Sequence, residues 1–183
     1  TYDIERSDLG LMLAMQDQRL LSDYWDLVQH LGRNAVKLET STAAMVQRIA
    51  AGKYYLGYNV LGSYALARAR HDPNIGVVLP TDYTMVMSRV ALINKKARHP
   101  YAAKLWLDHM LSRQGQSILS EKAELFSIRT DLFTDYSADA LQRGPVQALK
   151  PIALTLPLLV FLDRAKQQEF IKRWNPALRG PTN

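Results

Sequence analysis

The chain has 183 residues, of which 48% are hydrophobic and 22% are charged, and this composition excludes a disordered protein and allows a buried core. Because the chain has no cysteine, disulfides, thiol nucleophiles and cysteine-ligated zinc are excluded as well. The formal net charge of +6 suits an anionic partner, but we expect no nucleic-acid partner, because the densest basic group, residues 94–99, lacks the interleaved aromatic residues of such a surface.

Signals for strands and helices alternate over the first 80 residues. Apolar runs bounded by turn residues predict strands at residues 2–4, 36–38, 54–60 and 75–79. Apolar residues at three-to-four-residue spacing predict helices at residues 9–15, 23–31, 43–50 and 63–70. The expected N-caps of the first three helices are Ser7 or Asp8, Ser22, and Thr40–Ser41. Such alternation predicts an α/β fold with a mostly parallel sheet flanked by helices.

The pattern changes after Pro80. Residues 89–94 form another apolar run that predicts a strand, and Pro100 stands at the position where the first turn of a helix accepts proline. Helices are expected at residues 101–111 and 116–121, followed by an extended connection at 123–131. A last amphipathic stripe runs from residue 158 to residue 174, and Asn175–Pro176 is expected to end it.

Targeting and membrane signals are missing from this sequence. Its first residues, Thr1 to Ile4, have neither the basic start nor the apolar run of a signal peptide, so we expect a trimmed or partial chain. The longest apolar stretch, residues 151–162, contains two prolines and is shorter than the roughly 20 residues that span a bilayer.

The residues also argue against an enzyme. The nucleophile, β-lactamase and zinc-protease motifs GxSxG, SxxK and HExxH do not occur, and the four histidines lack the close spacing of a metal site on one helix. Gly52 and Gly57 have the first spacing of a phosphate-binding loop, but Tyr58 and Asn59 stand where the lysine and hydroxyl residue are needed. We therefore expect no catalytic residue, no metal and no cofactor.

Three stretches in this order resemble a known family. They are Thr1–Asp3 with Ser7–Gly10, then RIAAGKYYLGYNVLGSYALARAR at residues 48–70, and then the stretch from Pro80, which contains HPYAAKLWLDHMLSRQGQ at residues 99–116. The second resembles a helix, glycine, strand and short-helix unit, and the third resembles a helix that ends in Ser-x-x-Gly-Gln. Together they resemble the extracellular solute-binding proteins of ABC importers, in the group that binds ferric iron, phosphonates and sugar phosphates.

The resemblance implies a type II periplasmic-binding-protein-like fold, in which two α/β lobes close on a ligand and the chain crosses twice between them. It implies three parts for this chain: a second-lobe core at residues 1–79, a hinge crossover at 80–89, and a returning strand with C-terminal helices at 90–183. The first lobe would be absent from this sequence. A periplasmic or extracellular location and a membrane permease as partner follow from the same resemblance.

The candidate ligand-binding residues lie where strands are expected to end and helices to begin. Parallel sheets bind ligands at this edge, and Ser7 and Ser63 each combine a hydroxyl with the free N–H groups of a predicted helix N-terminus. Ordinary helix capping explains both serines equally well. Tyr58 and Asn59, near a predicted strand end, are further candidates, although tyrosine is also a common packing residue in strands.

Two further candidates, Asp82 and Tyr83, follow from the resemblance, because they lie where the family's chain crosses back between the lobes. By the same resemblance, Leu61 and Gly62 stand at the positions where iron-binding members have adjacent tyrosines. Tyr54 and Tyr55 lie earlier, where strand alternation would send their rings to opposite faces. We therefore expect an organic anion, such as a phosphonate, phosphate ester or carboxylate, and not ferric iron.

The sequence thus predicts the binding of a small anionic solute for delivery to an ABC-type importer, without catalysis. One alternative is a ligand-sensing domain of a receptor or transcriptional regulator with the same fold. Another is a folded remnant without a complete site. The residues of this chain do not separate these three possibilities.

Overall fold

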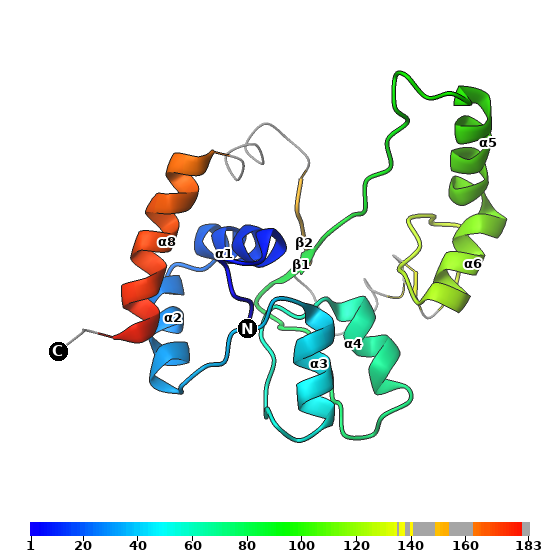
Figure 1. Ribbon diagram of the computed structural model, residues 1–183. Coiled ribbons are helices and arrows are strands. Elements are labelled where there is room, and N and C mark those ends of the chain that lie inside the picture. The colour runs from blue at the N-terminus through cyan, green and yellow to red at the C-terminus, as the bar shows by residue number, and fades with distance from the viewer. Residues whose placement is uncertain (135, 138–139, 141–148, 154–162, 181–183) are drawn as a thin grey trace. The chain divides into compact units, whose positions relative to one another are not determined.

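The computed structural model describes residues 1–134, 136–137, 140, 149–153 and 163–180 (Figure 1). The chain divides into two compact units. The first contains Thr1–Gly76 together with Ala153–Asn183, and the second contains Val77–Ile152. The part boundaries expected from the sequence, at residues 79 and 89, stay a prediction.

The first unit is built from helices whose beginnings are set by local capping. Ser7 accepts a hydrogen bond from Gly10 N at the start of α1, and Ser41 accepts one from Ala44 N at the start of α3, as the sequence predicts. Ser22 is not a cap, because Asp23 takes the N-cap position of α2. The helices of this unit are α1 (Asp8–Leu20), α2 (Tyr24–Arg33), α3 (Thr42–Ala50), α4 (Gly62–Ala69) and α8 (Arg164–Arg179).

The core of the first unit lies where α2 and α8 run side by side (Figure 1). Trp25 of α2 meets Phe170 of α8 at a ring distance of 5.4 Å, and Tyr24 lies 6.1 Å from Trp174. The guanidinium of Arg173 covers the outer face of this cluster, 4.1 Å from the ring centroid of Trp25. Large buried aromatic rings of this kind dominate core energetics, so they fix the α2–α8 pair.

The last turn of α8 corrects the expected helix end at Asn175–Pro176. The helix continues to Arg179 and contains Pro176, although proline removes one backbone hydrogen bond. Gly32 of α2 explains how this turn is held. A β-carbon at Gly32 would lie 1.9 Å from the carbonyl oxygen of Leu178, so the two backbones approach at a distance that only glycine allows. Gly32 thus lets the last turn of α8 pack directly against α2.

The second unit contains a small parallel sheet and two helices. Strand β1 (Thr84–Val86) pairs in parallel with β2 (Leu149–Pro151), with Thr84 opposite Leu149. Pro100 occupies the first turn of α5 (Pro100–Leu111), and Ser112 caps α6 (Arg113–Ala123) through Gly115 N. The chain is therefore a helix-rich α/β protein with a parallel ladder, which confirms the predicted fold class.

Several predicted strands are wrong. Residues 36–38, 54–60, 75–79 and 89–94 all belong to the described part of the chain, and the structure assigns no strand to them. The opening strand is reduced to one parallel bridge between Tyr2 and Glu39. A strand exists only when a neighbour pairs with it, so β propensity in one segment does not suffice. In 54–60 the backbone also turns at Asn59, whose φ is +61°.

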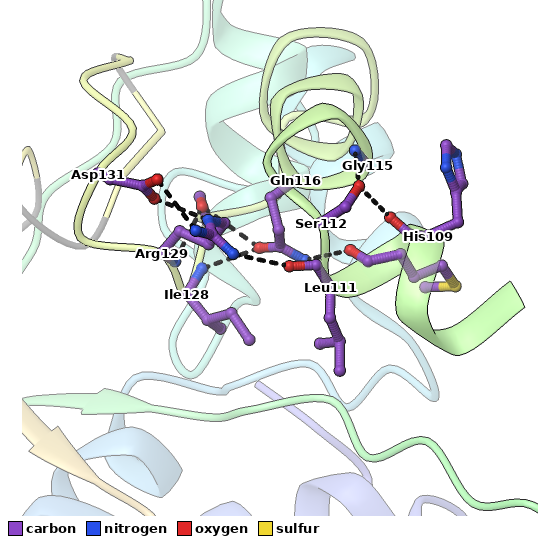
Figure 2. Close-up of polar contacts among 10 residues, drawn as sticks. His109, Leu111, Ser112, Gly115, Gln116, Ile128, Arg129 and Asp131 are labelled. Carbon is purple, nitrogen blue, oxygen red and sulfur yellow. Dashed lines mark hydrogen bonds and ion pairs between the residues drawn. The ribbon is translucent and has the colours of Figure 1, made fainter. Parts of the chain in front are cut away.

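A polar network fixes the corner between α5 and α6 (Figure 2). Gln116, only 6% exposed, donates to Met110 O at 2.8 Å and accepts from Ile128 N at 3.0 Å. Arg129 binds both carboxylate oxygens of Asp131, at 2.7 and 3.0 Å, and also donates to Leu111 O. These bonds join the start of α6 to residues 128–131, which follow the end of that helix. The sequence predicted only an extended connection there.

The Arg129–Asp131 pair also changes the acidity of the carboxyl group. Hydrogen bonds from the guanidinium hold the pKa of Asp131 below its ordinary value of 3.8, because they stabilise the ionised carboxylate. Both side chains are partly exposed, so solvent weakens the attraction between them. The bidentate geometry fixes the orientation of the guanidinium relative to the carboxylate.

Candidate functional site

The loop that precedes α4 is fastened to α1 by a buried carboxylate. The hydroxyl of Tyr58 donates to Asp17 Oδ2 at 2.9 Å, and the side-chain amide of Asn59 donates to the same oxygen at 2.6 Å. Asp17 is 1% exposed, so these donors satisfy a charge that water cannot reach. Hydrogen bonds to a charged group are stronger than neutral ones, and the loop is therefore firmly held at this point.

A second tie fastens the end of the same loop to the start of α3. Thr42 Oγ1 accepts from Leu61 N at 3.1 Å and shares a hydrogen bond of 2.6 Å with the hydroxyl of the buried Tyr2. Gly57 lets the loop pass close to α3, because a β-carbon there would lie 3.0 Å from Cδ1 of Ile49. Tyr2, the start of α3 and the loop before α4 are thus joined by hydrogen bonds at the point where α4 begins.

The N-terminus of α4 is the feature that this loop positions. Its N-cap, Leu61, offers no side-chain hydrogen bond, and the first turn contains no acidic residue. The space around Gly62 is open, since a β-carbon there would meet nothing within 4 Å. The first N–H groups of a helix have no acceptor within it, and they carry the positive end of the helix dipole. This terminus can therefore attract an anionic or carbonyl oxygen.

The candidate residues of the first unit have different surroundings. Ser63 lies in the first turn of α4 and is partly exposed, next to the open space at Gly62. Tyr58 and Asn59 both point to Asp17. Ser7 is buried, and its hydroxyl already serves as the cap of α1.

The two remaining candidates belong to the second unit, directly before β1. Asp82 is exposed and Tyr83 is half-buried, and the turn that contains them is closed by a 3.0 Å hydrogen bond from Thr84 Oγ1 to Pro80 O. The structure thus brings Tyr58 and Asn59 together in one network around Asp17, while Asp82 and Tyr83 are adjacent in another unit.

Asp17 and Thr42 carry this network, and neither residue was predicted from the sequence. Asp17 could have been recognised from its position in α1. It follows Leu13 by four residues and Ala14 by three, which places it on the same buried face of the helix. A carboxylate on an apolar face requires partners, which would have directed attention to it. Its partners, more than 40 residues away, were not predictable from local pattern.

A hollow of about 600 Å³ lies between α6 and residues 132–134, and its lining includes Arg113, Glu121 and Phe133 but no candidate residue. Within the described ranges, no group of three or more histidine or carboxylate residues is arranged to hold a metal ion. The described helices are all too short or too polar to cross a membrane.

Comparison with known proteins gives the family. Residues 7–146 match the family described as bacterial extracellular solute-binding protein. The structure is also similar to a crystal structure of the substrate-binding protein of an ABC transporter from Agrobacterium tumefaciens, with a TM-score of 0.87 and 35% sequence identity. That match covers 97% of this chain and 52% of the Agrobacterium chain, so this chain spans about half of that protein's length. No curated protein matches the sequence.

These matches confirm the resemblance stated from the sequence motifs. The family match extends over most of the chain, from the cap of α1 to the residues after α6, and the structural match includes both units. Proteins of this family bind solutes without catalysis and lie outside the cytoplasm, in the periplasm or the extracellular space. The chain therefore belongs to the bacterial extracellular solute-binding proteins and shares the fold of an ABC-transporter substrate-binding protein.

Proposed function

We propose that this protein binds a small anionic solute and delivers it to the membrane permease of an ABC-type importer. The family match over residues 7–146 is the observation that carries solute binding. The similarity to a substrate-binding protein of an ABC transporter supports the importer as its destination. The anion is supported by the uncapped N-terminus of α4, which offers N–H donors and no acidic side chain.

The binding residues that we propose are Ser7, Tyr58, Asn59, Ser63, Asp82 and Tyr83. Ser63 and the first amides of α4 would donate to the anion, while Tyr58 and Asn59 would shape the loop that leads to it. Asp82 and Tyr83 would line the crossover between lobes, at residues 80–89. A phosphonate, phosphate ester or carboxylate has the several acceptor oxygens that such donors require.

A thermal-shift screen of the full-length protein tests this proposal. The screen compares phosphonates, sugar phosphates and carboxylates with neutral sugars and with ferric iron. A ligand at 100 times its dissociation constant adds roughly 2.7 kcal/mol to the free energy of unfolding, which gives a clear rise in melting temperature. We expect the rise with an anion. Stabilisation only by neutral solutes or by iron would contradict the anionic part of the proposal.

The substitution Ser63→Asp makes the screen specific to the proposed site. A carboxylate in the first turn of α4 interacts favourably with the helix dipole, so the unliganded protein should be as stable or slightly more stable. The same charge repels an anionic ligand, and affinity should fall at least tenfold. Ser22→Asp, an exposed position in the same unit, is the matched control and should keep its affinity. Equal affinities of the two variants would exclude the α4 terminus.

A further inference from the structure

The C-terminal ends of α2 and α8 border a small hollow in the first unit. Its volume is about 270 Å³, and Gly180, the C-cap of α8, forms part of its lining. The two helices supply the rest, namely Gln29, Gly32 and Arg33 of α2 and Pro176, Ala177 and Arg179 of α8. None of these described lining residues is acidic, and none is among the proposed solute contacts. The hollow is therefore separate from the α4 terminus.

A close backbone contact brings two arginines to this hollow. Gly32 packs directly against the carbonyl oxygen of Leu178, and the residues that follow these two are Arg33 and Arg179. Both arginines are exposed, and neither forms an ion pair with another residue in the described part of the chain. Two positive charges on one small hollow repel each other, so an anion between them would lower the electrostatic energy.

The carbonyl groups at the end of α2 do not require the charge of Arg33. A cation at a helix C-terminus often serves the free carbonyl groups there. In α2, however, Leu31 O already accepts a hydrogen bond from Val36 N at 3.1 Å. Gly32 O likewise accepts from Ala35 N at 2.9 Å. The guanidinium of Arg33 therefore keeps N–H donors that can serve a ligand.

We propose that Arg33 and Arg179 bind a phosphate group in this hollow, either as inorganic phosphate or as part of a small phosphate ester. A guanidinium presents a planar fork of N–H donors, and each fork fits two oxygens of one anion. Two arginines thus favour an anion with more acceptor oxygens than a single carboxylate has. A phosphate ester also carries a charge of about −1.5 to −2 at pH 7, which balances both guanidiniums. The site does not depend on the proposed solute.

An NMR titration of the full-length protein with inorganic phosphate, at constant ionic strength, tests this proposal. The backbone amide signals of Gly32 and Gly180 and the Nε–H signals of both arginines should shift together and reach saturation. These signals report on this hollow alone, so binding at α4 does not enter the result. A parallel titration with glycerol phosphate shows whether the free ion or an ester binds more tightly.

Acetate is the matched ligand control, because it has a single carboxylate. We expect it to bind at least tenfold more weakly than inorganic phosphate. Absence of a saturable shift with both phosphate compounds would overturn the proposal. Acetate that binds as tightly as phosphate would overturn it as well, because the paired forks would then give no preference for a phosphate group.

Substitutions separate this site from a general attraction to a basic protein. Arg33→Gln and Arg179→Gln should each weaken phosphate binding at least tenfold, and the melting temperature of the unliganded protein should not fall, because both side chains are exposed. Arg164→Gln removes the same charge at the other end of α8, about 22 Å away at 1.5 Å per residue, and should keep its affinity. Unchanged affinity in the first two variants, or equal weakening in all three, would contradict the site.

Discussion

The side-chain amide of Asn59 lies 2.6 Å from Oδ2 of Asp17, and this hydrogen bond joins the loop before α4 to the buried face of α1. Asn59 adopts a left-handed backbone conformation, with φ of +61°, which asparagine tolerates better than most residues. The proposed anion-binding terminus of α4 is thus positioned by a residue of another helix. Asp17 therefore holds the loop in place through its hydrogen bonds, although it is not among the proposed solute contacts.

Replacement of Asp17 by asparagine should destabilise the first unit. The new amide keeps one oxygen but loses the charge that strengthens the bonds from Tyr58 and Asn59. Hydrogen bonds to charged groups contribute about 1.5–3 kcal/mol, so we expect the free energy of unfolding to fall by roughly that amount. Urea denaturation followed by tryptophan fluorescence measures it. The exposed Asp108→Asn is the control, and an equal effect of both changes would contradict a special role for Asp17.

Local signals in the sequence predicted the helices better than the strands. Ser7 and Ser41 were identified as caps because a cap needs only its own next few residues. The strands expected at 54–60, 75–79 and 89–94 failed because each requires a pairing partner elsewhere. Residues 158–162 of the expected last helix lie outside the described residues, and α8 begins at Arg164.

The candidate site was predictable only in part, for the same physical reason. The position of Ser63 in the first turn of α4 could be predicted because a hydroxyl at a helix start is a local pattern, and its role in binding stays a prediction. The contact of Tyr58 with Asp17 spans 41 residues, and the tie from Leu61 to Thr42 spans 19. No local rule predicts such contacts. The family was nevertheless found, because it depends on the order of several motifs along the chain.

Replacement of Gly32 by alanine should separate the ends of α2 and α8. The new methyl group would lie 1.9 Å from the carbonyl oxygen of Leu178, a backbone atom that cannot move aside cheaply. Overpacking of this kind costs about 1–3 kcal/mol. Thermal unfolding followed by circular dichroism gives the loss. Gly76→Ala has open space around it and should be nearly neutral, so a similar loss there would remove the steric explanation.

Replacement of Gln116 by leucine should loosen the segment after α6. The change leaves Met110 O and Ile128 N, both only partly buried, without their side-chain partner, and the loss of a hydrogen bond of this kind costs about 0.5–1.5 kcal/mol. Hydrogen exchange of the Ile128 amide should become faster. Gln114→Leu, at an exposed position of the same helix, should not change it. Unaltered exchange at Ile128 in the Gln116 variant would show that the network in Figure 2 does not hold this segment.

The Arg129–Asp131 pair predicts how the second unit responds to acid. Because the pKa of Asp131 is lower in the folded protein, the pair contributes its full stability above the ordinary value of 3.8. That contribution to stability is lost as the pH falls from 3.8 through the lower pKa that Asp131 has in the folded protein. A carbon-13 NMR titration of the Asp131 carboxyl should give a midpoint below 3.8, and Arg129→Gln should raise it. A midpoint that is the same in both proteins would contradict the pairing.

The most direct test of the central claim is one calorimetric titration of the full-length protein with the anion that stabilises it most in the thermal screen. A solute-binding protein should give a saturable heat with a stoichiometry of one, and the signal should return to baseline after each injection. The Ser63→Asp variant should give a titration at least tenfold weaker. Sustained heat after each injection would indicate turnover of the solute, and absence of any saturable heat would indicate no binding. Either result would contradict the proposal that this protein captures an anionic solute without changing it.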